Sequence, residues 1–282
     1  MTAGQTPVSS DVGLARKIER AEADLMARAA EVAADRDDNP GSFVSPIAGG
    51  VGTFAGVDSP FNKVAGVGFD GLIEAAELNA VEDEFALRRS PVQFELSSLG
   101  DPAIAEQLAD RGYQLVGLEN VLGISLRGYV GRPSAAGIEV RACELEEYEL
   151  WVELVAEAAA HPDDQGSPSH EEFPRSAIKL AEGDLLGAGS MPYLAIRNGV
   201  AAGGGSIRIA GDIAQLTGAA TAVEHRRRGV QTALLAARLR DAAAAGCEVA
   251  TVTVPPGSKS QVNAERSGFN LLYARSILVK NE

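Results

Sequence analysis

The spacing of apolar and polar residues predicts several amphipathic helices. Over residues 12–34, apolar side chains recur at helical intervals with charged residues between them, which is typical of a helix with one buried side. Asp101 followed by Pro102 marks another helix start, because Asp caps free N–H groups and Pro suits the first turn. Further helices are expected around residues 78–85, at 144–160 and from residue 174.

Other stretches alternate in polarity or are continuously apolar, which is typical of strands. Val92, Phe94 and Leu96 give the clearest alternation. Asn198-Gly199 between two apolar runs predicts a tight hairpin, because both residues accept positive φ angles. Strands are expected at residues 62–69, 92–96, 115–126, 138–141, 193–197, 200–209 and 213–221. The chain therefore reads as a mixture of helices and strands.

Residues 223–235 (VEHRRRGVQTALL) combine a strand end, a basic turn and the first turns of a helix. The helix is expected to begin near Val230 and to end at Gly246. A helix start carries unpaired N–H groups and a partial positive charge, so it suits an anion. Arg226, Arg227 and Arg228 add cationic donors at that point. The alternative is a solvated basic turn without a ligand.

The six residues RRRGVQ at 226–231 resemble the Q/R-x-x-G-x-G/A signature of the GNAT superfamily of acetyltransferases. The resemblance implies that the main-chain N–H groups of this segment hold the pyrophosphate of acetyl-CoA. It also implies that the preceding strand, with small residues such as Ala219 and Ala220, receives the pantetheine arm and polarises the thioester. Gln231 departs from the signature, which has Gly or Ala at that position.

A second resemblance lies near the C-terminus, where residues 260–269 (SQVNAERSGF) are similar to the family's S-x-x-N-x-x-R-x-G-F helix end. It makes Ser260 and Asn263 candidate contacts of the cofactor. An N-cap role for Ser260 is the alternative. Gly268 is expected to end the helix, with Phe269 in the core. Many members carry a tyrosine as general acid where this chain has Ala264, so no tyrosine acid is assigned.

The first half of the chain repeats the element order of the second. Residues 111–116 (RGYQLV) match residues 267–272 (SGFNLL), although chance agreement of glycine and apolar positions is an alternative. We expect an α/β (α+β) fold with two GNAT-like lobes, each a mixed, mainly antiparallel twisted sheet flanked by helices. The expected domains are 1–130, with the N-terminal helix, and 137–282. The loop at 68–74 (GFDGLIE) has two carboxylates and no Arg or Lys, so the first lobe is expected not to hold CoA.

Composition narrows the function classes. The chain has 282 residues, 45% hydrophobic content and a formal net charge of −14, which favours a packed globular core and argues against general nucleic-acid binding. It has no apolar run of membrane-spanning length, and Cys143 and Cys247 lack disulfide or zinc spacing. We therefore expect a cytoplasmic protein with no metal, no nucleic-acid partner and no membrane partner.

The resemblance implies an acetyl-CoA-dependent N-acyltransferase that acts on a primary amine of a small molecule or peptide. A non-catalytic CoA-binding sensor is one alternative, and a scaffold whose arginine turn binds another phosphate is a second. The lobes are expected in a monomer or a homodimer. The general base is unassigned: His170, Glu171, Glu172 and Tyr273 carry suitable groups, and a structural or solvated role is the alternative for each. The candidate cofactor-binding residues are Ala219, Ala220, Thr221, Arg226, Arg227, Arg228, Gly229, Val230, Gln231, Thr232, Ser260 and Asn263.

Overall fold

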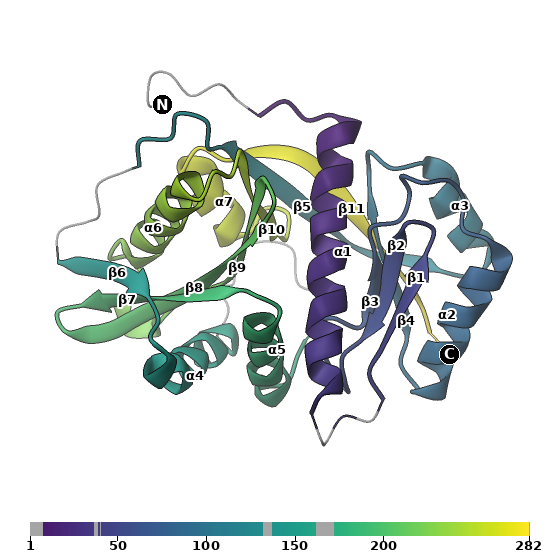
Figure 1. Ribbon diagram of the computed structural model, residues 1–282, viewed down its shortest axis with the longest axis horizontal. Helices are drawn as coiled ribbons and strands as arrows, with labels where there is room; N and C mark the ends of the chain where they lie inside the picture. The colour runs from purple at the N-terminus through teal and green to yellow at the C-terminus, as the bar shows by residue number, and fades with distance from the viewer. Residues whose placement is uncertain (1–7, 37–38, 40, 132–136, 162–171, 282) are drawn as a thin grey trace. The chain divides into compact units, whose positions relative to one another are not determined.

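The computed structural model describes residues 8–36, 39, 41–131, 137–161 and 172–281 (Figure 1). These residues form two compact units, each built from both halves of the sequence. Unit 1 contains the described residues within 122–161 and 189–270, with residue 8. Unit 2 contains those within 9–121, 172–188 and 271–281. The expected domains, 1–130 and 137–282, describe two copies of a repeated sequence, and these boundaries stay a prediction.

Unit 2 is a sheet with helices against it. Its strand order is β1-β2-β3-β4-β11-β5, and β1–β2, β2–β3 and β11–β4 pair antiparallel while β3–β4 is parallel. The helix α1 packs along β2 and β3 (Figure 1). The elements are α1 (Val12–Ala34), β1 (Phe43–Ile47), β2 (Gly50–Phe54), β3 (Lys63–Ala65), α2 (Ala75–Leu87), β4 (Val92–Ser97), α3 (Pro102–Asp110), β5 (Gln114–Ser125), α5 (Arg175–Gly187) and β11 (Asn270–Lys280).

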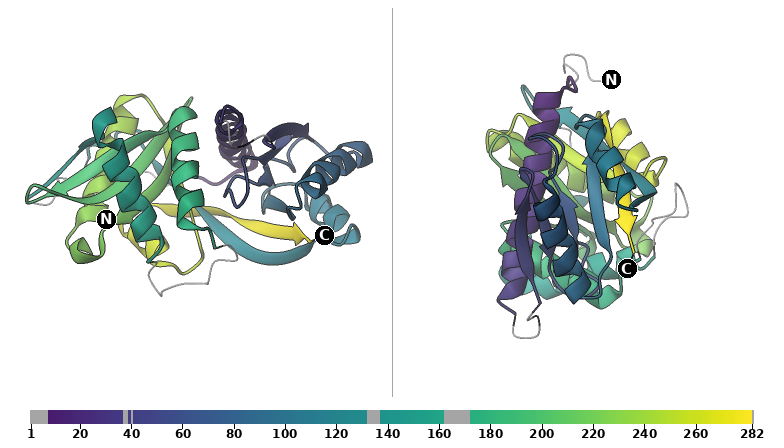
Figure 2. Two further views of the ribbon diagram at one scale, coloured as in Figure 1. Left: turned by 90° about the horizontal axis from the view of Figure 1, so that it is seen from below. Right: turned by 90° about the vertical axis from the view of Figure 1, so that its right-hand side faces the viewer.

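Unit 1 repeats this plan, with the strand order β5-β10-β9-β8-β7-β6. The helices α4 and α6 cover opposite faces of its strands (Figure 2). Both β5 and β11 contribute residues to each unit. The elements are β6 (Ile138–Ala142), a 3-10 turn (Leu145–Glu147), α4 (Tyr148–Ala159), β7 (Met191–Arg197), β8 (Val200–Ala210), β9 (Ile213–Thr221), a 3-10 turn (Val223–His225), α6 (Val230–Ala244), β10 (Val249–Val254) and α7 (Lys259–Arg266).

The order and pairing of strands confirm the predicted fold class and the internal repeat. In unit 2, two antiparallel pairings lead to a parallel pair, β3 with β4, joined by α2. In unit 1, β7–β8 and β8–β9 are antiparallel, and β9 is parallel to β10 with α6 between them. Each sheet is thus mixed but mainly antiparallel.

Most helices lie where the spacing predicts them. The helix α1 spans the predicted residues 12–34, with Asp11 as its N-cap. Asp101 caps α3, and Asn198 and Gly199 both have positive φ in the β7–β8 turn. The strand predicted at 62–69 is wrong beyond Ala65, because Gly66 and Gly68 adopt positive φ angles that end the extended backbone.

Each unit has its own apolar core. In unit 1, Leu234 and Leu239 of α6 pack with strand residues such as Ile207 and with Phe269, which confirms the core position predicted for Phe269. In unit 2, Phe85 and Phe94 are fully buried among aliphatic side chains. Within the described ranges, no helix is both long and apolar enough to cross a membrane. The same residues include no group of three or more His, Cys, Asp or Glu side chains placed to hold a metal ion.

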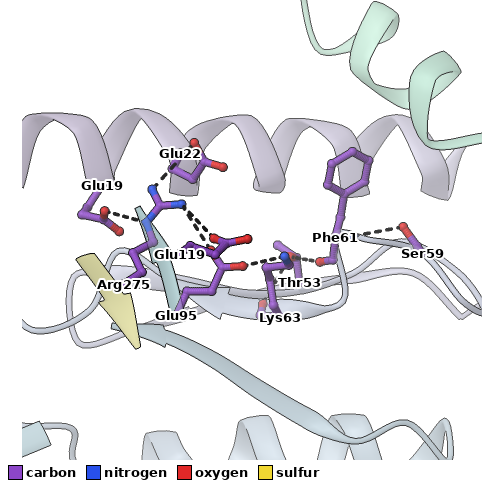
Figure 3. A network of polar contacts seen from close by, with 9 residues as sticks. All are labelled: Glu19, Glu22, Thr53, Ser59, Phe61, Lys63, Glu95, Glu119 and Arg275. Atoms are coloured by element: carbon purple, nitrogen blue, oxygen red, sulfur yellow. Dashed lines mark hydrogen bonds and ion pairs between the residues drawn. The ribbon is translucent and has the colours of Figure 1, made fainter. Parts of the chain in front are cut away.

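The polar interior of unit 2 contains an ion-pair network under α1 (Figure 3). Arg275 of β11 is 1% exposed and contacts Glu19 of α1 and Glu95 of β4 at 2.8 and 3.4 Å. Lys63 of β3 donates to the other oxygen of Glu95 at 2.6 Å. These pairs connect α1 to three neighbouring strands. A buried charge without a partner is costly, so each of these charges needs the others in place.

Candidate functional site

The strand β9 changes register close to its C-terminal end. Gly204 of β8 pairs with Ala220, but Ser206 pairs with Thr217, so β9 holds one extra residue between these two pairs. Gly218 lies in the extra segment with φ +52, which a glycine adopts without strain. This is a β-bulge, and it turns the main chain of β9 out of the regular ladder.

The bulge coincides with the end of the pairing between β9 and β10. The recorded parallel pairs run from Ile213–Val249 to Gln215–Thr251, while β9 continues to Thr221 and β10 to Val254. The strands therefore part in the described segment just before the bulge. Main-chain groups of residues 218–221 are accordingly available to a ligand on that side.

The arginine loop follows at once, and its backbone conformation is specific. Arg226 is extended, Arg227 has φ +60 and Gly229 has φ +85. Gly229 is the N-cap of α6 and contributes no side-chain cap. The predicted order of strand, basic turn and helix is thus present, with the helix beginning at the predicted Val230.

The first turn of α6 presents N–H groups to its N-terminal side. The first helical main-chain bond runs from the Ala233 N–H to the Gly229 carbonyl at 3.0 Å. The N–H groups of Val230, Gln231 and Thr232 precede that bond, as in any helix start. Gln231 is half-buried and Thr232 is exposed. The residue at 231 is longer than the family signature requires, yet its N–H belongs to the same turn.

The three arginines do not behave alike. Arg226 is half-buried, and its Nη2 donates to the His161 carbonyl at 2.5 Å, which ties the loop to the end of α4. Arg227 and Arg228 are exposed. Guanidinium groups beside a helix start raise the local positive charge, so this end of unit 1 favours an anion within a chain of net charge −14.

The helix α7 carries the second group of candidates. Its N-cap is Ser258, whose Oγ accepts from the Gln261 N–H at 3.1 Å, so the alternative cap role of Ser260 is wrong. Ser260 is the second residue of α7 and is exposed, and Asn263 is half-buried. Gly268 follows the helix end with φ +101, as predicted.

The position that carries a tyrosine in many family members is Ala264, which is 5% exposed. Tyr273 is engaged elsewhere, because its hydroxyl donates to Oε1 of Glu19 at 2.6 Å inside unit 2. Burial, followed by the Glu19 charge, raises the pKa of Tyr273 far above its usual range. Tyr273 is therefore unsuited to proton transfer at neutral pH. Of the other residues with groups suited to a base, Glu172 is exposed, and His170 and Glu171 lie outside the described residues.

The consecutive glycines at residues 203–205 of β8 let α6 and α4 pack closely against this strand. A Cβ added to Gly203 would lie 2.6 Å from Cγ1 of Val230 in α6, and one added to Gly204 would lie 2.7 Å from Nε1 of Trp151 in α4. Trp151 is 1% exposed and donates to the Tyr193 carbonyl at 3.0 Å. The glycines thus set the distance between the start of α6 and the strands that form the bulge.

The corresponding loop of unit 2, at residues 68–74, is covered by side chains of α1 and by the turn between β1 and β2. Asp70 pairs with Arg20 at 3.2 Å and with Arg16 at 3.6 Å, and Arg16 also donates to the Phe69 carbonyl. The sequence shows no cation in this loop, but α1 supplies two. A Cβ on Gly49 would lie 2.3 Å from the Asp70 carboxylate, so the turn between β1 and β2 covers it as well.

Three residues at these sites were not predicted from the sequence. Arg16 and Arg20 pair with Asp70, and Arg238 of α6 donates to the main-chain carbonyls of Ser206 and Thr217. A signal for Arg238 was visible, since it interrupts the apolar positions of α6. The roles of Arg16 and Arg20 depend on how α1 packs, which the local pattern does not contain.

Comparisons with known proteins find a family model that matches part of the chain and solved structures with a similar fold. The model of the acetyltransferase (GNAT) family matches residues 152–269. A GCN5-related N-acetyltransferase from Kribbella flavida has a similar structure, with a TM-score of 0.63 and 18% identity over 90% of this chain and 96% of that one. A tandem GNAT protein from the clavulanic acid biosynthesis pathway matches with a TM-score of 0.59 and 12% identity over 98% of both chains. No curated protein sequence matches the chain.

The fold of this chain is thus similar to that of GNAT acetyltransferases, with two GNAT-like lobes. The segment that matches the GNAT family model, residues 152–269, includes β9, the arginine loop and all of α7. Proteins of this family transfer an acyl group from acyl-CoA, so the bulge and the start of α6 belong to the part of the chain where that chemistry is expected.

Proposed function

We propose that the chain is an acetyl-CoA-dependent N-acyltransferase that moves an acetyl group to a primary amine of a small molecule or peptide. The observation that carries this proposal is the continuity of the β9 bulge with the helix start at Gly229. Within a few residues the chain offers main-chain groups freed from pairing and an amide-lined helix entrance. These two features fit a long ligand with a polar arm and a diphosphate.

The candidate residues divide by the part of acetyl-CoA that they would hold. Ala219, Ala220 and Thr221 would lie along the pantetheine arm, where small side chains leave room for it. The N–H groups of residues 229–232 would bind the diphosphate, with the arginines at 226–228 as cationic neighbours. Ser260 and Asn263 of α7 would contact the arm or the nucleotide.

When bound, acetyl-CoA supplies an activated thioester. Transfer forms a bond between the acceptor nitrogen and the acyl carbon, breaks the carbon–sulfur bond, and moves a proton from the amine while the thiolate gains one. The main-chain N–H groups near the bulge are suited to stabilise the developing oxyanion. Positioning two reactants side by side supplies much of the acceleration without a dedicated base. The net charge of −14 favours a cationic acceptor.

Calorimetry of the full chain with acetyl-CoA tests the binding half of the proposal. Replacing Arg226 and Arg228 by Ala should weaken binding by about tenfold or more, because charge-assisted hydrogen bonds to phosphate are each worth about 1.5–3 kcal/mol. Arg240→Ala is the matched control, since Arg240 is exposed in α6 and pairs with Asp241 at 2.9 Å. Unchanged affinity in the double variant would count against the diphosphate assignment.

The second candidate function is a CoA-binding sensor without turnover. Ala264 at the usual tyrosine position and the engagement of Tyr273 by Glu19 favour it. Thiol release measured with acetyl-CoA and a panel of primary amines separates the two functions. Amine-dependent release supports the enzyme, whereas tight acetyl-CoA binding with no release above the rate without protein supports the sensor.

We infer that the protein acts in the cytoplasm. Both cysteines are free thiols, and Cys247 is buried, which suits a reducing compartment.

A further inference from the structure

Arg238 is a buried cation at the centre of unit 1. It lies on α6, and only 1% of its surface is exposed. Its Nη1 donates to the Ser206 carbonyl at 2.8 Å and to the Thr217 carbonyl at 3.2 Å. Its Nε donates to the carbonyl of Leu234, in the same helix, at 3.2 Å. All of its hydrogen-bond acceptors recorded in the described chain are thus main-chain carbonyls.

Burying a guanidinium without a carboxylate is costly. Burial lowers the pKa of Arg238 to about 10, and the side chain still carries its charge at neutral pH. A leucine or methionine would fill this position in a helix that is otherwise apolar on the same side. The cost suggests that Arg238 performs a specific structural task.

The acceptors of Arg238 identify that task. Ser206 and Thr217 form the first regular pair beyond the β9 bulge, at the point where the ladder loses its register. A bulge leaves main-chain groups outside the ladder, and buried carbonyls need donors. One guanidinium nitrogen reaches the carbonyls of both strands, so it holds β8 and β9 together where the bulge begins.

The strand is shaped to receive this guanidinium. A Cβ added to Gly205 would lie 3.0 Å from both Cζ and Nη1 of Arg238, so any larger residue would push the guanidinium away from β8 by a few tenths of an ångström. On the same pair of residues, the hydroxyls of Ser206 and Thr217 lie 2.7 Å apart. The bulge is therefore held by its main chain and by its side chains.

We propose that Arg238 is a positioning residue that fixes the β9 bulge in the form that receives the pantetheine arm of acyl-CoA. The inference rests on the proposed function for the nature of the ligand. Arg238 lies behind the strand and acts through the conformation of residues 217–221. It should therefore affect the arm of the ligand and leave the diphosphate loop at Gly229 unchanged.

The test compares two ligands on the full chain: acetyl-CoA, and adenosine 3′-phosphate 5′-diphosphate, which carries the nucleotide and its diphosphate without the pantetheine arm. Arg238→Met should weaken acetyl-CoA binding by about tenfold, equivalent to about 1.4 kcal/mol, and change binding of the nucleotide fragment less than twofold. Arg238→Lys keeps the charge with one nitrogen and should give an intermediate loss. Arg240→Met is the matched control on the exposed side of α6.

Amide hydrogen exchange without ligand gives a second measurement. Exchange at residues 217–221 should be faster in Arg238→Met and Arg238→Lys than in Arg240→Met, while the core of α6 keeps its protection. If Arg238→Met does not fold, the lysine variant decides. Equal weakening of the binding of both ligands, unchanged exchange at residues 217–221, or unchanged acetyl-CoA affinity would each overturn the proposal.

The two proposals fail in different ways. A wild-type chain that binds no acetyl-CoA overturns the proposed function and, with it, the pantetheine role of Arg238. The exchange comparison then still shows whether Arg238 holds the bulge. A wild-type chain that binds acetyl-CoA, with Arg238 variants that bind it equally well, overturns only the role of Arg238.

Discussion

Nε of Arg275 lies 2.8 Å from Oε1 of Glu19, and both side chains are only 1% exposed. The two residues stand almost at opposite ends of the sequence, yet they meet under α1 of unit 2 (Figure 3). The same carboxylate oxygen accepts from the Tyr273 hydroxyl. Glu19 is thus the common partner of two buried residues of β11, and it fixes the last strand of the chain to the first helix.

Removing Glu19 should destabilise unit 2 strongly. Glu19→Ala leaves the Arg275 charge buried without its nearest partner, for which we expect a loss of roughly 3–5 kcal/mol in the free energy of unfolding. Urea denaturation of the full chain measures it. Glu22→Gln is the control, since Glu22 lies 3.9 Å from Arg275 and its side chain is 24% exposed. This variant should lose little free energy of unfolding. A Glu19→Ala loss below 1 kcal/mol would show that the network is dispensable.

Glu182 should make stability fall as the pH rises. Burial in α5 raises the pKa of this carboxyl to about 7, from an ordinary value of 4.5, and its Oε2 lacks a hydrogen-bond partner in the described structure. Between these two values the folded chain keeps a proton that the unfolded chain has lost. Unfolding therefore releases a proton, and the free energy of unfolding decreases with pH by up to about 1.4 kcal/mol per unit.

The measurement is the free energy of unfolding from pH 5 to pH 8 for the wild type and Glu182→Gln. The glutamine cannot ionise, so the variant should lose this part of the slope and be more stable than the wild type above pH 7. Glu146→Gln serves as the control, because Glu146 is exposed. Parallel curves for the wild type and Glu182→Gln would refute the raised pKa.

Arg227→Gly should stabilise the protein. Arg227 has φ +60, a left-handed conformation that costs a non-glycine residue about 1 kcal/mol or more, and glycine adopts it freely. We expect a gain of about 1 kcal/mol in thermal and chemical unfolding. Arg228→Gly, at the next exposed position, should give no gain because Arg228 is absent from the positive-φ residues of the described chain. A loss of stability in Arg227→Gly would mean that its side chain contributes more than its backbone costs.

Gly204→Ala should disturb Trp151, which is the single tryptophan of the chain. The added methyl would lie 2.7 Å from Nε1 and 2.9 Å from Cδ1 of Trp151, so α4 must move away from β8. We expect a loss of roughly 1–3 kcal/mol and a red-shifted tryptophan emission. Gly41→Ala is the control, because its new methyl would have only ordinary contacts at 3.7 Å or more. Unchanged emission would show that the helix is not packed as described.

The sequence predicts those parts of the fold that depend on neighbouring residues. The helix at 12–34 and the turn at Asn198-Gly199 follow from local spacing and turn chemistry, and both are confirmed. The start of α6 at Val230 follows from the glycine before it. The contacts between Arg275 and Glu19 could not be predicted in this way, because they form only after β11 pairs with β4.

In the candidate site, too, features that depend on neighbouring residues are predicted from the sequence, and features that depend on strand pairing are not. The arginine loop carries a short signature, and the structure places it between the predicted strand and helix. The β9 bulge has only a weak signal in Gly218, since a glycine in a strand has several uses. Arg238 was readable as an exception in an apolar helix, but its acceptors Ser206 and Thr217 are defined by strand register.

One acetyl-CoA should bind per chain, and it should bind at Gly229. In unit 2 the carboxylate of Asp70 already takes Arg16 and Arg20, which are the cations an incoming diphosphate would need. Calorimetry should therefore give a stoichiometry of one for the wild type. Asp70→Asn, which removes the charge with little change of shape, should leave the affinity of this first equivalent unchanged, because Asp70 belongs to unit 2 and Gly229 to unit 1. A second equivalent in the wild type, or a loss of the single equivalent in Asp70→Asn, would place acyl-CoA in the first lobe and contradict the assignment.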